Sequence, residues 1–242
     1  MPLGLVVFAR LDSRRLPGKA LCDVAGRPLL GRVLDRVRAV QPAMPVIVAT
    51  SDRALDDPIA MFAEAEGVEV FRGSADDVVG RALACAETFG LSAIVRISGD
   101  SPFIDPALIE QCIARFETAE PRLDLVTNIM PRSFPPGVSV EIIGIGALRL
   151  MAREAASLEE REHVTLYMYR NVTRFRIENV VAPDARYEGV TLTVDEPRDL
   201  ERTLWISARL GTRAATAPLD DVVILARRFD AERLSEVVHE RA

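Results

Sequence analysis

Short runs of apolar residues alternate with longer amphipathic stretches through the first half of the chain. Each apolar run has the length of a strand that is buried on both faces, and each stretch between them has the periodicity of a helix. The strands expected here are residues 5–9, 45–50, 68–71 and 93–97, and the expected helices are residues 27–40, 53–66, a helix capped by Ser74 that ends near Phe89, and one that begins at Pro106. This alternation predicts a three-layer αβα fold around a mostly parallel sheet.

The rhythm changes after residue 124, where the apolar runs surround a proline-rich loop. The elements expected from there are strands at residues 124–127, 138–143, 174–177 and 190–194, helices near residues 146–156, 159–169 and 197–210, and a charged helical tail. Because no repeat or low-complexity linker divides the chain, we expect a single domain over residues 1–242 with an inserted β/α subregion at about 124–185.

The distribution of charge along the chain singles out one segment near the N-terminus. The 242 residues carry a net charge of −6 and a pI near 5.2, which argues against a general nucleic-acid-binding surface. Basic residues nevertheless crowd into the opening, at Arg10, Arg14, Arg15, Lys19 and Arg27. A local basic cluster in an acidic chain indicates a small polyanion as ligand.

The cysteines and the apolar runs bear on where the protein works. Cys22, Cys85 and Cys112 have no metal-ligand spacing and are expected to be reduced thiols. No run approaches the roughly 20 apolar residues of a membrane span, and the N-terminus lacks the pattern of a signal peptide. We therefore expect a cytoplasmic protein with neither a membrane nor a nucleic acid as partner.

The segment from Arg10 to Lys19 directly follows the first expected strand, where ligands of open α/β sheets bind. Pro17 and Gly18 impose a tight turn, and the arginine and lysine side chains suit phosphate oxygens. Several cations so close together would repel one another without an anion to share, which favours a di- or triphosphate. A solvated surface turn is the alternative. The segment matches neither a Walker A motif nor Gly-x-Gly-x-x-Gly, which disfavours kinases and dinucleotide-dependent dehydrogenases.

Two aspartates also follow expected strands. Asp100 lies in Ile97-Ser98-Gly99-Asp100, and Asp195 follows the run that ends at Val194. Carboxylates at the sheet edge that carries a phosphate loop are suitable ligands for Mg²⁺. An ordinary turn at Asp100 and an ordinary helix N-terminus at Asp195 are the alternatives.

The pattern Arg10-x-x-Ser13-x-Arg15-Leu16-Pro17-Gly18-Lys19, with Gly26-Arg27-Pro28-Leu29, resembles the signature loop of cytidylyltransferases with the nucleotide-diphospho-sugar transferase-like (Rossmann-like) fold. Within these enzymes the chain is similar to the spore coat polysaccharide biosynthesis protein F group, which is related to the acylneuraminate and 3-deoxy-manno-octulosonate cytidylyltransferases. The likeness extends from Val6 to about Leu204. It implies a Mg²⁺-dependent, homodimeric enzyme that transfers CMP from CTP to a sugar acid or similar acceptor and releases pyrophosphate, in surface polysaccharide or glycan biosynthesis.

The resemblance also assigns roles to residues of this sequence. It implies that Arg10, Lys19 and Asp100 are catalytic and that Asp100 and Asp195 bind the metal. The candidate nucleotide-binding residues are Ala9, Arg10, Ser13, Arg15, Gly18, Lys19, Thr50, Ser51 and Ser98, together with Arg81, which is a candidate from its place on the helix after Asp76 and Asp77. On the acceptor side the resemblance implies Glu141 and His163, because residues 137–141 and 160–165 resemble acceptor-side segments of these enzymes, and Asn128 is a further polar candidate near them.

Other functions stay open at this point. A sugar acid acceptor would give a CMP product, and a phosphorylated acceptor would give a CDP product. A sugar-phosphate nucleotidyltransferase that uses another NTP is the nearest alternative, and a catalytically inactive nucleotide-binding regulator is the alternative from another class. A glycosyltransferase is disfavoured because no Asp-x-Asp motif follows an expected strand.

Overall fold

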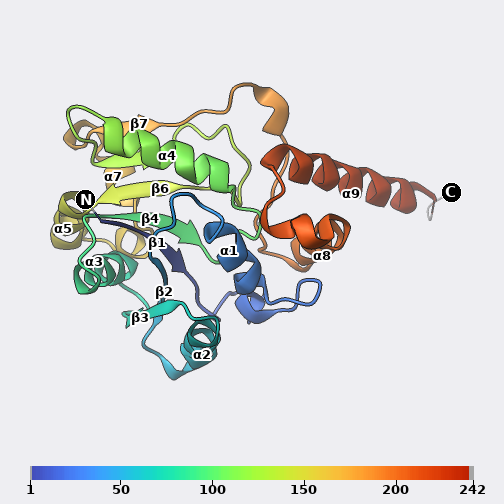
Figure 1. Ribbon diagram of the computed structural model, residues 1–242, viewed down its shortest axis with the longest axis horizontal. Helices are drawn as coiled ribbons and strands as arrows, with labels where there is room; N and C mark the ends of the chain where they lie inside the picture. The colour runs from blue at the N-terminus through green and yellow to red at the C-terminus, as the bar shows by residue number, and fades with distance from the viewer. Residues whose placement is uncertain (1, 240–242) are drawn as a thin grey trace.

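Seven strands form one mixed sheet in the computed structural model, which describes residues 2–239, with side chains to Ser235 (Figure 1). The strands, in the spatial order β3-β2-β1-β4-β6-β5-β7, are β3 (Glu69–Gly73), β2 (Val46–Ser51), β1 (Leu3–Phe8), β4 (Ala93–Ser98), β6 (Glu141–Gly144), β5 (Leu125–Thr127) and β7 (Ile177–Asn179). Neighbouring strands run parallel except that β6 is antiparallel to both β4 and β5. The predicted mostly parallel sheet is confirmed.

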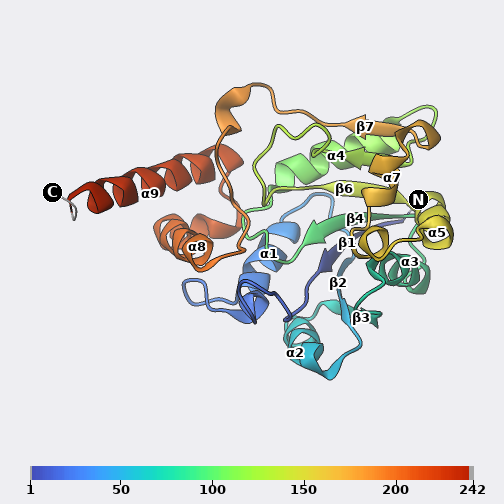
Figure 2. The same cartoon turned by 180° about the vertical axis from the view of Figure 1, so that it is seen from behind.

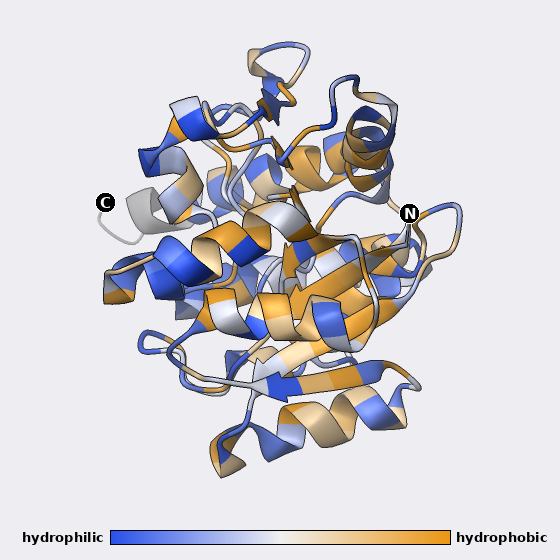
Figure 3. Cartoon of the chain, turned by 90° about the vertical axis from the view of Figure 1, so that its left-hand side faces the viewer, coloured by the Kyte–Doolittle hydropathy of each residue, from blue (hydrophilic) through white to orange (hydrophobic). Residues whose placement is uncertain are grey.

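The apolar runs form strands because helices cover both faces of the sheet. Every residue of β1 is buried, and its side chains alternate between two cores. One face is covered by α1 (Leu29–Val37), α2 (Asp57–Ala65) and α4 (Pro106–Thr118); the other is covered by α3 (Val78–Thr88), α5 (Ile145–Glu154) and α7 (Leu166–Arg170). The views from the two sides show these layers, and the apolar residues gather on the strands between them (Figures 2 and 3).

The segment 124–185 extends the sheet. It supplies β5, β6 and β7, and it adds α5, α6 (Leu158–Glu162) and α7 to one face. The chain ends with α8 (Pro197–Leu210) and α9 (Leu219–His239), and α9 extends away from the sheet (Figure 1). None of the helices in residues 2–239 is long and apolar enough to cross a membrane.

Four local predictions are wrong, each for a physical reason. The strand expected at residues 174–177 begins only at its last residue, as β7, because Val172–Arg174 form a 3-10 turn. Residues 190–194 belong to no strand, because the N–H groups of Leu192 and Val194 donate to loop carbonyls, those of Pro136 and Asp100, rather than to a neighbouring strand. Helix α3 begins later than expected, because the carboxylate of Asp77 accepts the Gly80 N–H at 2.8 Å and caps the helix in place of Ser74. The single helix expected at residues 159–169 is divided into α6 and α7, because His163 has extended backbone angles.

Candidate nucleotide site

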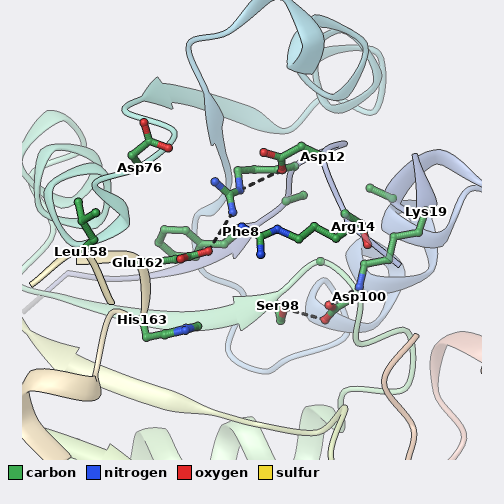
Figure 4. A pocket seen from close by; sticks show the side chains of 15 residues that line it. Phe8, Asp12, Arg14, Lys19, Asp76, Ser98, Asp100, Leu158, Glu162 and His163 are labelled. Carbon is green, nitrogen blue, oxygen red and sulfur yellow. Dashed lines mark hydrogen bonds and ion pairs between the residues drawn. The ribbon is translucent and has the colours of Figure 1, made fainter. Parts of the chain in front are cut away.

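A cavity of about 800 Å³ lies at the carboxyl ends of β1 and β4, where the fold places ligands (Figure 4). The loop after β1, the turn after β4 and helix α6 form its walls. Seven predicted site residues line it: Ala9, Arg10, Ser13, Lys19, Ser98, Asp100 and His163. Lys19 and Asp100 are at one end, and Glu162 and His163 are at the other (Figure 4).

Lys19 is the centre of the first end. Gly18 has a left-handed backbone (φ 74°) that starts a short 3-10 turn over Lys19–Leu21 and turns the lysine inward. The ammonium donates to Asp100 Oδ2 at 2.8 Å, to Asp195 Oδ1 at 2.9 Å and to the Val194 carbonyl at 2.7 Å. These bonds use all three donors of the buried amine.

The charge state of Lys19 follows from these partners. Burial by itself lowers the pKa of the Lys19 amine, but attraction and hydrogen bonds from Asp100 and Asp195 outweigh it and raise the pKa above its ordinary value. The sequence also contains no other lysine. This lone lysine, among 29 arginines, was a signal that the pattern analysis missed.

The two aspartates meet although they are 95 positions apart in the sequence. The Val194 N–H donates to the Asp100 carbonyl at 3.0 Å, so the extended segment before Asp195 is bound directly to the turn after β4. Asp199 accepts the N–H groups of Asp195 and Glu196 at 3.1 and 3.0 Å and thereby shapes the start of α8. A backbone contact, rather than the expected strand, therefore places Asp195.

The donor set at this end suits Mg²⁺. Besides Lys19, Asp100 Oδ1 accepts from Ser98 Oγ at 2.7 Å, and Asp195 Oδ2 faces Arg15 at 3.0 Å. Mg²⁺ commonly takes one or two carboxylates and completes its shell with phosphate oxygens and water. No group of three or more metal-ligating side chains occurs among the residues that the structure describes. A metal here would therefore depend on its substrate for further ligands.

Partly exposed charges form the opposite end. Arg10 donates to the Ala75 carbonyl at 2.6 Å, and its guanidinium lies 3.4 Å from Asp12 and 3.7 Å from Glu162. Helix α6, which carries Glu162, buries none of its side chains, and it is further connected by an ion pair of 2.8 Å between Arg161 and Asp77. The sequence did not identify the Asp12 and Glu162 carboxylates, because only folding brings them to Arg10.

Three predicted nucleotide contacts lie behind the cavity wall. Thr50 and Ser51 are fully buried at the end of β2, and the Ser51 hydroxyl donates to Asp56. Arg81 is 3% exposed, and its guanidinium donates to the Ser74 carbonyl at 2.8 Å and lies 5.6 Å from the Phe8 ring centre. Burial lowers the pKa of Arg81 to about 10. None of the three lines the cavity.

Of the three predicted acceptor residues, two lie outside the cavity. Asn128 is buried, and its amide donates to the Val138 carbonyl and accepts the Val140 N–H, each at 2.9 Å. Glu141 is buried as well, with its carboxylate bonded to protein groups. Only His163 reaches the cavity. Asn128 and Glu141 therefore do not line this cavity: the loop before β6 encloses Asn128, and residues of β4 and of the α7 segment enclose Glu141.

Comparison with known proteins agrees with this geometry. The family model described as cytidylyltransferase matches residues 5–203. The chain is 31% identical to the spore coat polysaccharide biosynthesis protein SpsF of Bacillus subtilis, over 93% of this chain and 95% of that protein. It is similar in structure to a cytidylyltransferase from Leptospira borgpetersenii, with a TM-score of 0.88, 28% identity and coverage of 96% of both chains.

A more distant structure shares the fold. A CMP:2-keto-3-deoxy-manno-octonic acid synthetase complexed with CTP matches with a TM-score of 0.65 and 19% identity, over 86% of this chain and 99% of the other. The family match covers the loop from Arg10 to Lys19, the turn at Asp100 and Asp195. The chain therefore belongs to the cytidylyltransferase family and is a nucleotidyltransferase.

Proposed function

We propose that this enzyme transfers CMP from CTP to a sugar-type acceptor, with release of pyrophosphate, in surface polysaccharide or glycan biosynthesis. The observation that carries the proposal is the joining of Lys19, Asp100 and Asp195 at one end of a cavity that also contains Arg10. CTP bound to a synthetase of the same fold, and the pathway named for the SpsF relative, support it.

In the proposed reaction, an acceptor oxygen attacks the α-phosphorus of CTP. The bond from that phosphorus to the bridging oxygen breaks, and the β- and γ-phosphates leave together as pyrophosphate. The protein's part is to orient the phosphates and to stabilise negative charge, with no covalent intermediate.

The residues around the cavity divide this work. Arg10 and Lys19, which line the cavity, and Arg15, which lies beside Asp195, would hold the phosphates and the leaving pyrophosphate. Asp100 and Asp195 would hold Mg²⁺, which, when bound, neutralises charge on the phosphate oxygens. In this structure the Lys19 ammonium is paired with both carboxylates, so it keeps them close together and reduces their mutual repulsion.

The acceptor would enter from the side of His163. This side chain lines the cavity at the end opposite to Lys19, so an acceptor bound there would approach the phosphates from across the cavity (Figure 4). A sugar acid with an anomeric hydroxyl and a phosphorylated sugar both fit a cavity of this volume.

The experiment is pyrophosphate release measured with CTP, UTP, GTP and dTTP against a panel of sugar acids and sugar phosphates, with Mg²⁺ and with EDTA. We expect CTP to be preferred, EDTA to stop the reaction, and a CMP-linked product in the mass spectrum. Preference for another NTP with a sugar phosphate would replace the proposal with a different nucleotidyltransferase. CTP binding without pyrophosphate release under any condition would indicate an inactive regulator.

We further propose that the enzyme is a cytoplasmic homodimer that pairs through the segment 124–185. Four large apolar side chains are exposed there: Met130, Leu158, Val172 and Val181. Exposed apolar side chains are common where subunits meet, although single ones also occur on monomers. Light scattering at micromolar concentration should give a mass near 53 kDa, about twice the chain mass of 26.6 kDa. A mass equal to one chain would contradict the dimer.

A further inference from the structure

The carboxylate of Glu141 lies at the centre of a buried polar cluster next to the cavity. Glu141 is 1% exposed, and its oxygens accept from Thr165 Oγ1 at 2.6 Å, from the Tyr169 hydroxyl at 2.6 Å and from the guanidinium of Arg96. The Tyr169 and Thr127 hydroxyls are also bonded, at 2.8 Å. Buried carboxylates need such partners, and this one has them entirely within the protein.

Two of the partners belong to the segment that forms the cavity wall. Thr165 directly precedes α7, and Tyr169 lies within α7. His163 stands only two positions before Thr165, and its carbonyl accepts the Leu166 N–H at 2.8 Å. The hydroxyl of Thr165 therefore fixes the chain immediately after the histidine that lines the cavity.

The third partner connects Glu141 with the cavity floor. Arg96 lies in β4 opposite Glu141 of β6, and its guanidinium carbon is 6.0 Å from the ring centre of Phe8. Phe8 lines the cavity. The buried Glu141 carboxylate thus connects β4, which lies beside the cavity residue Phe8 of β1, with the segment that carries His163.

The rest of that wall is held by ion pairs that water can reach. Helix α6 has no buried side chain; it lies against α3 and is joined to it and to the β1 loop through the partly exposed pairs Arg161–Asp77 and Arg10–Glu162. Exposed ion pairs contribute little to holding a segment in place, whereas buried hydrogen bonds to a charged group contribute much more. Burial and the adjacent Glu141 carboxylate also raise the pKa of the Tyr169 hydroxyl, which stays protonated and can donate.

We propose that Glu141 is a positioning residue: through Thr165 and Tyr169 it holds His163 at the acceptor side of the cavity, and it does not itself contact the acceptor. This proposal rests on the proposed function in one respect, that the acceptor binds beside His163. It differs from the direct-contact role that the family resemblance implies for Glu141.

The positioning can be measured without turnover. The sequence has two histidines, so enzyme labelled with ¹⁵N-histidine gives two sets of ring signals, and His163→Ala identifies the signals of His163. We expect Thr165→Val and Tyr169→Phe to shift or broaden the His163 signals. Tyr167→Phe is the matched control, because that hydroxyl lies in the same helix but contacts Glu154 at 2.7 Å. His163 signals that match wild type in both test variants would overturn the proposal.

Kinetics then separate positioning from direct contact. We expect Thr165→Val and Tyr169→Phe to raise the acceptor KM roughly 5- to 10-fold, as for the loss of one buried hydrogen bond, with the CTP KM changed less than about twofold. Glu141→Gln should act in the same direction, and Thr165→Ser, which keeps the hydroxyl, should restore the wild-type KM. An effect of Glu141→Gln alone, with both hydroxyl variants normal, would show direct contact and overturn the proposal.

The two measurements keep the proposals distinguishable. If no acceptor supports turnover, the function proposed above fails, while the NMR comparison still decides whether Glu141 positions His163. A general loss of folding in Thr165→Val would appear in its thermal unfolding curve, and in that case Tyr169→Phe carries the test.

Discussion

The two ends of the cavity are built in different ways. At one end Lys19 is buried, uses all of its donors and is bound to two segments that also bond to each other through their backbones. At the other end Arg10 and Glu162 meet on the surface at 3.7 Å, beside a helix without buried side chains. The first end is preorganised before any ligand arrives, whereas the second can rearrange at small cost.

This difference has an electrostatic reason. A charge removed from water interacts strongly and needs complete pairing, so the buried Lys19 ammonium favours one arrangement of its partners. Exposed pairs are screened by water and salt, so several arrangements have similar free energies. In a nucleotidyltransferase, a fixed end suits the metal and the reacting phosphate, and an adjustable end suits the entry of substrates.

Replacing Lys19 tests the preorganised end most severely. We expect Lys19→Met to lower kcat/KM at least roughly 10³-fold, because a donor aimed at phosphate charge is lost. Asp100 and Asp195 would also be left near each other without their cation, so the free energy of unfolding should fall by about 1–3 kcal/mol. Pyrophosphate release and chemical denaturation measure the two effects. Unchanged stability would show that the cluster is not held by its charges.

The metal assignment predicts the next largest effect. We expect Asp100→Asn to lower kcat about 10²- to 10³-fold and to raise the Mg²⁺ concentration needed for half-maximal rate, because a neutral amide is a poor ligand for a hard cation. Asp105→Asn makes the same change five residues later, where the side chain only caps α4, and should stay close to wild type. A purified Asp100→Asn enzyme with nearly normal rate would refute the assignment.

The titration of the Lys19 amine can be measured directly, because the chain has no other lysine. The folded-state pKa lies above the ordinary value of 10.5, so the stabilisation from this amine is complete below about pH 10.5 and is lost as pH rises through the folded pKa. ¹³C-lysine NMR should give a single titration with a midpoint above 10.5, and Asp100→Asn should lower that midpoint. A midpoint at or below 10.5 in wild type would mean that burial outweighs the carboxylates.

The end of the cavity with Arg10 and Glu162 predicts the smallest effect, which is a gain in binding rather than a loss of activity. We expect Glu162→Gln to strengthen CTP binding roughly two- to fivefold, because a carboxylate that competes with phosphate for Arg10 is neutralised. Glu159→Gln is the control: it lies on the same helix but pairs with Arg170 at 2.6 Å. Isothermal titration without acceptor measures both. Weaker binding in Glu162→Gln would show that this carboxylate supports the nucleotide site instead.

The sequence placed the loop from Arg10 to Lys19 and the Asp100 turn at the edge of the sheet where the cavity lies, because both directly follow buried strands of the parallel sheet. It did not show that Thr50, Ser51 and Arg81 lie behind the cavity wall. A pattern predicts which side chains share a strand or a face, but it does not predict which later segments cover them. The bond from Ser51 to Asp56 and the contact of Arg81 with Phe8 are consequences of that covering.

Asp195 is a second residue whose surroundings the sequence pattern did not predict. An apolar run before a carboxylate predicted that Asp195 lies beside Asp100, and the structure brings both to Lys19, although the run forms no strand. The backbone bond between Val194 and Asp100 holds the aspartate where the ladder of a strand was expected to hold it.

By itself, the sequence determined the layers of the fold, the edge of the sheet at which the cavity lies and the types of charged residue that meet there. These follow from local periodicity and from the direction of parallel strands. The tertiary structure alone decided that Lys19 joins the two aspartates, that Glu162 faces Arg10 and that Glu141 is enclosed by Thr165, Tyr169 and Arg96. Each of those contacts joins segments far apart in the chain, and packing rather than local pattern sets their distance.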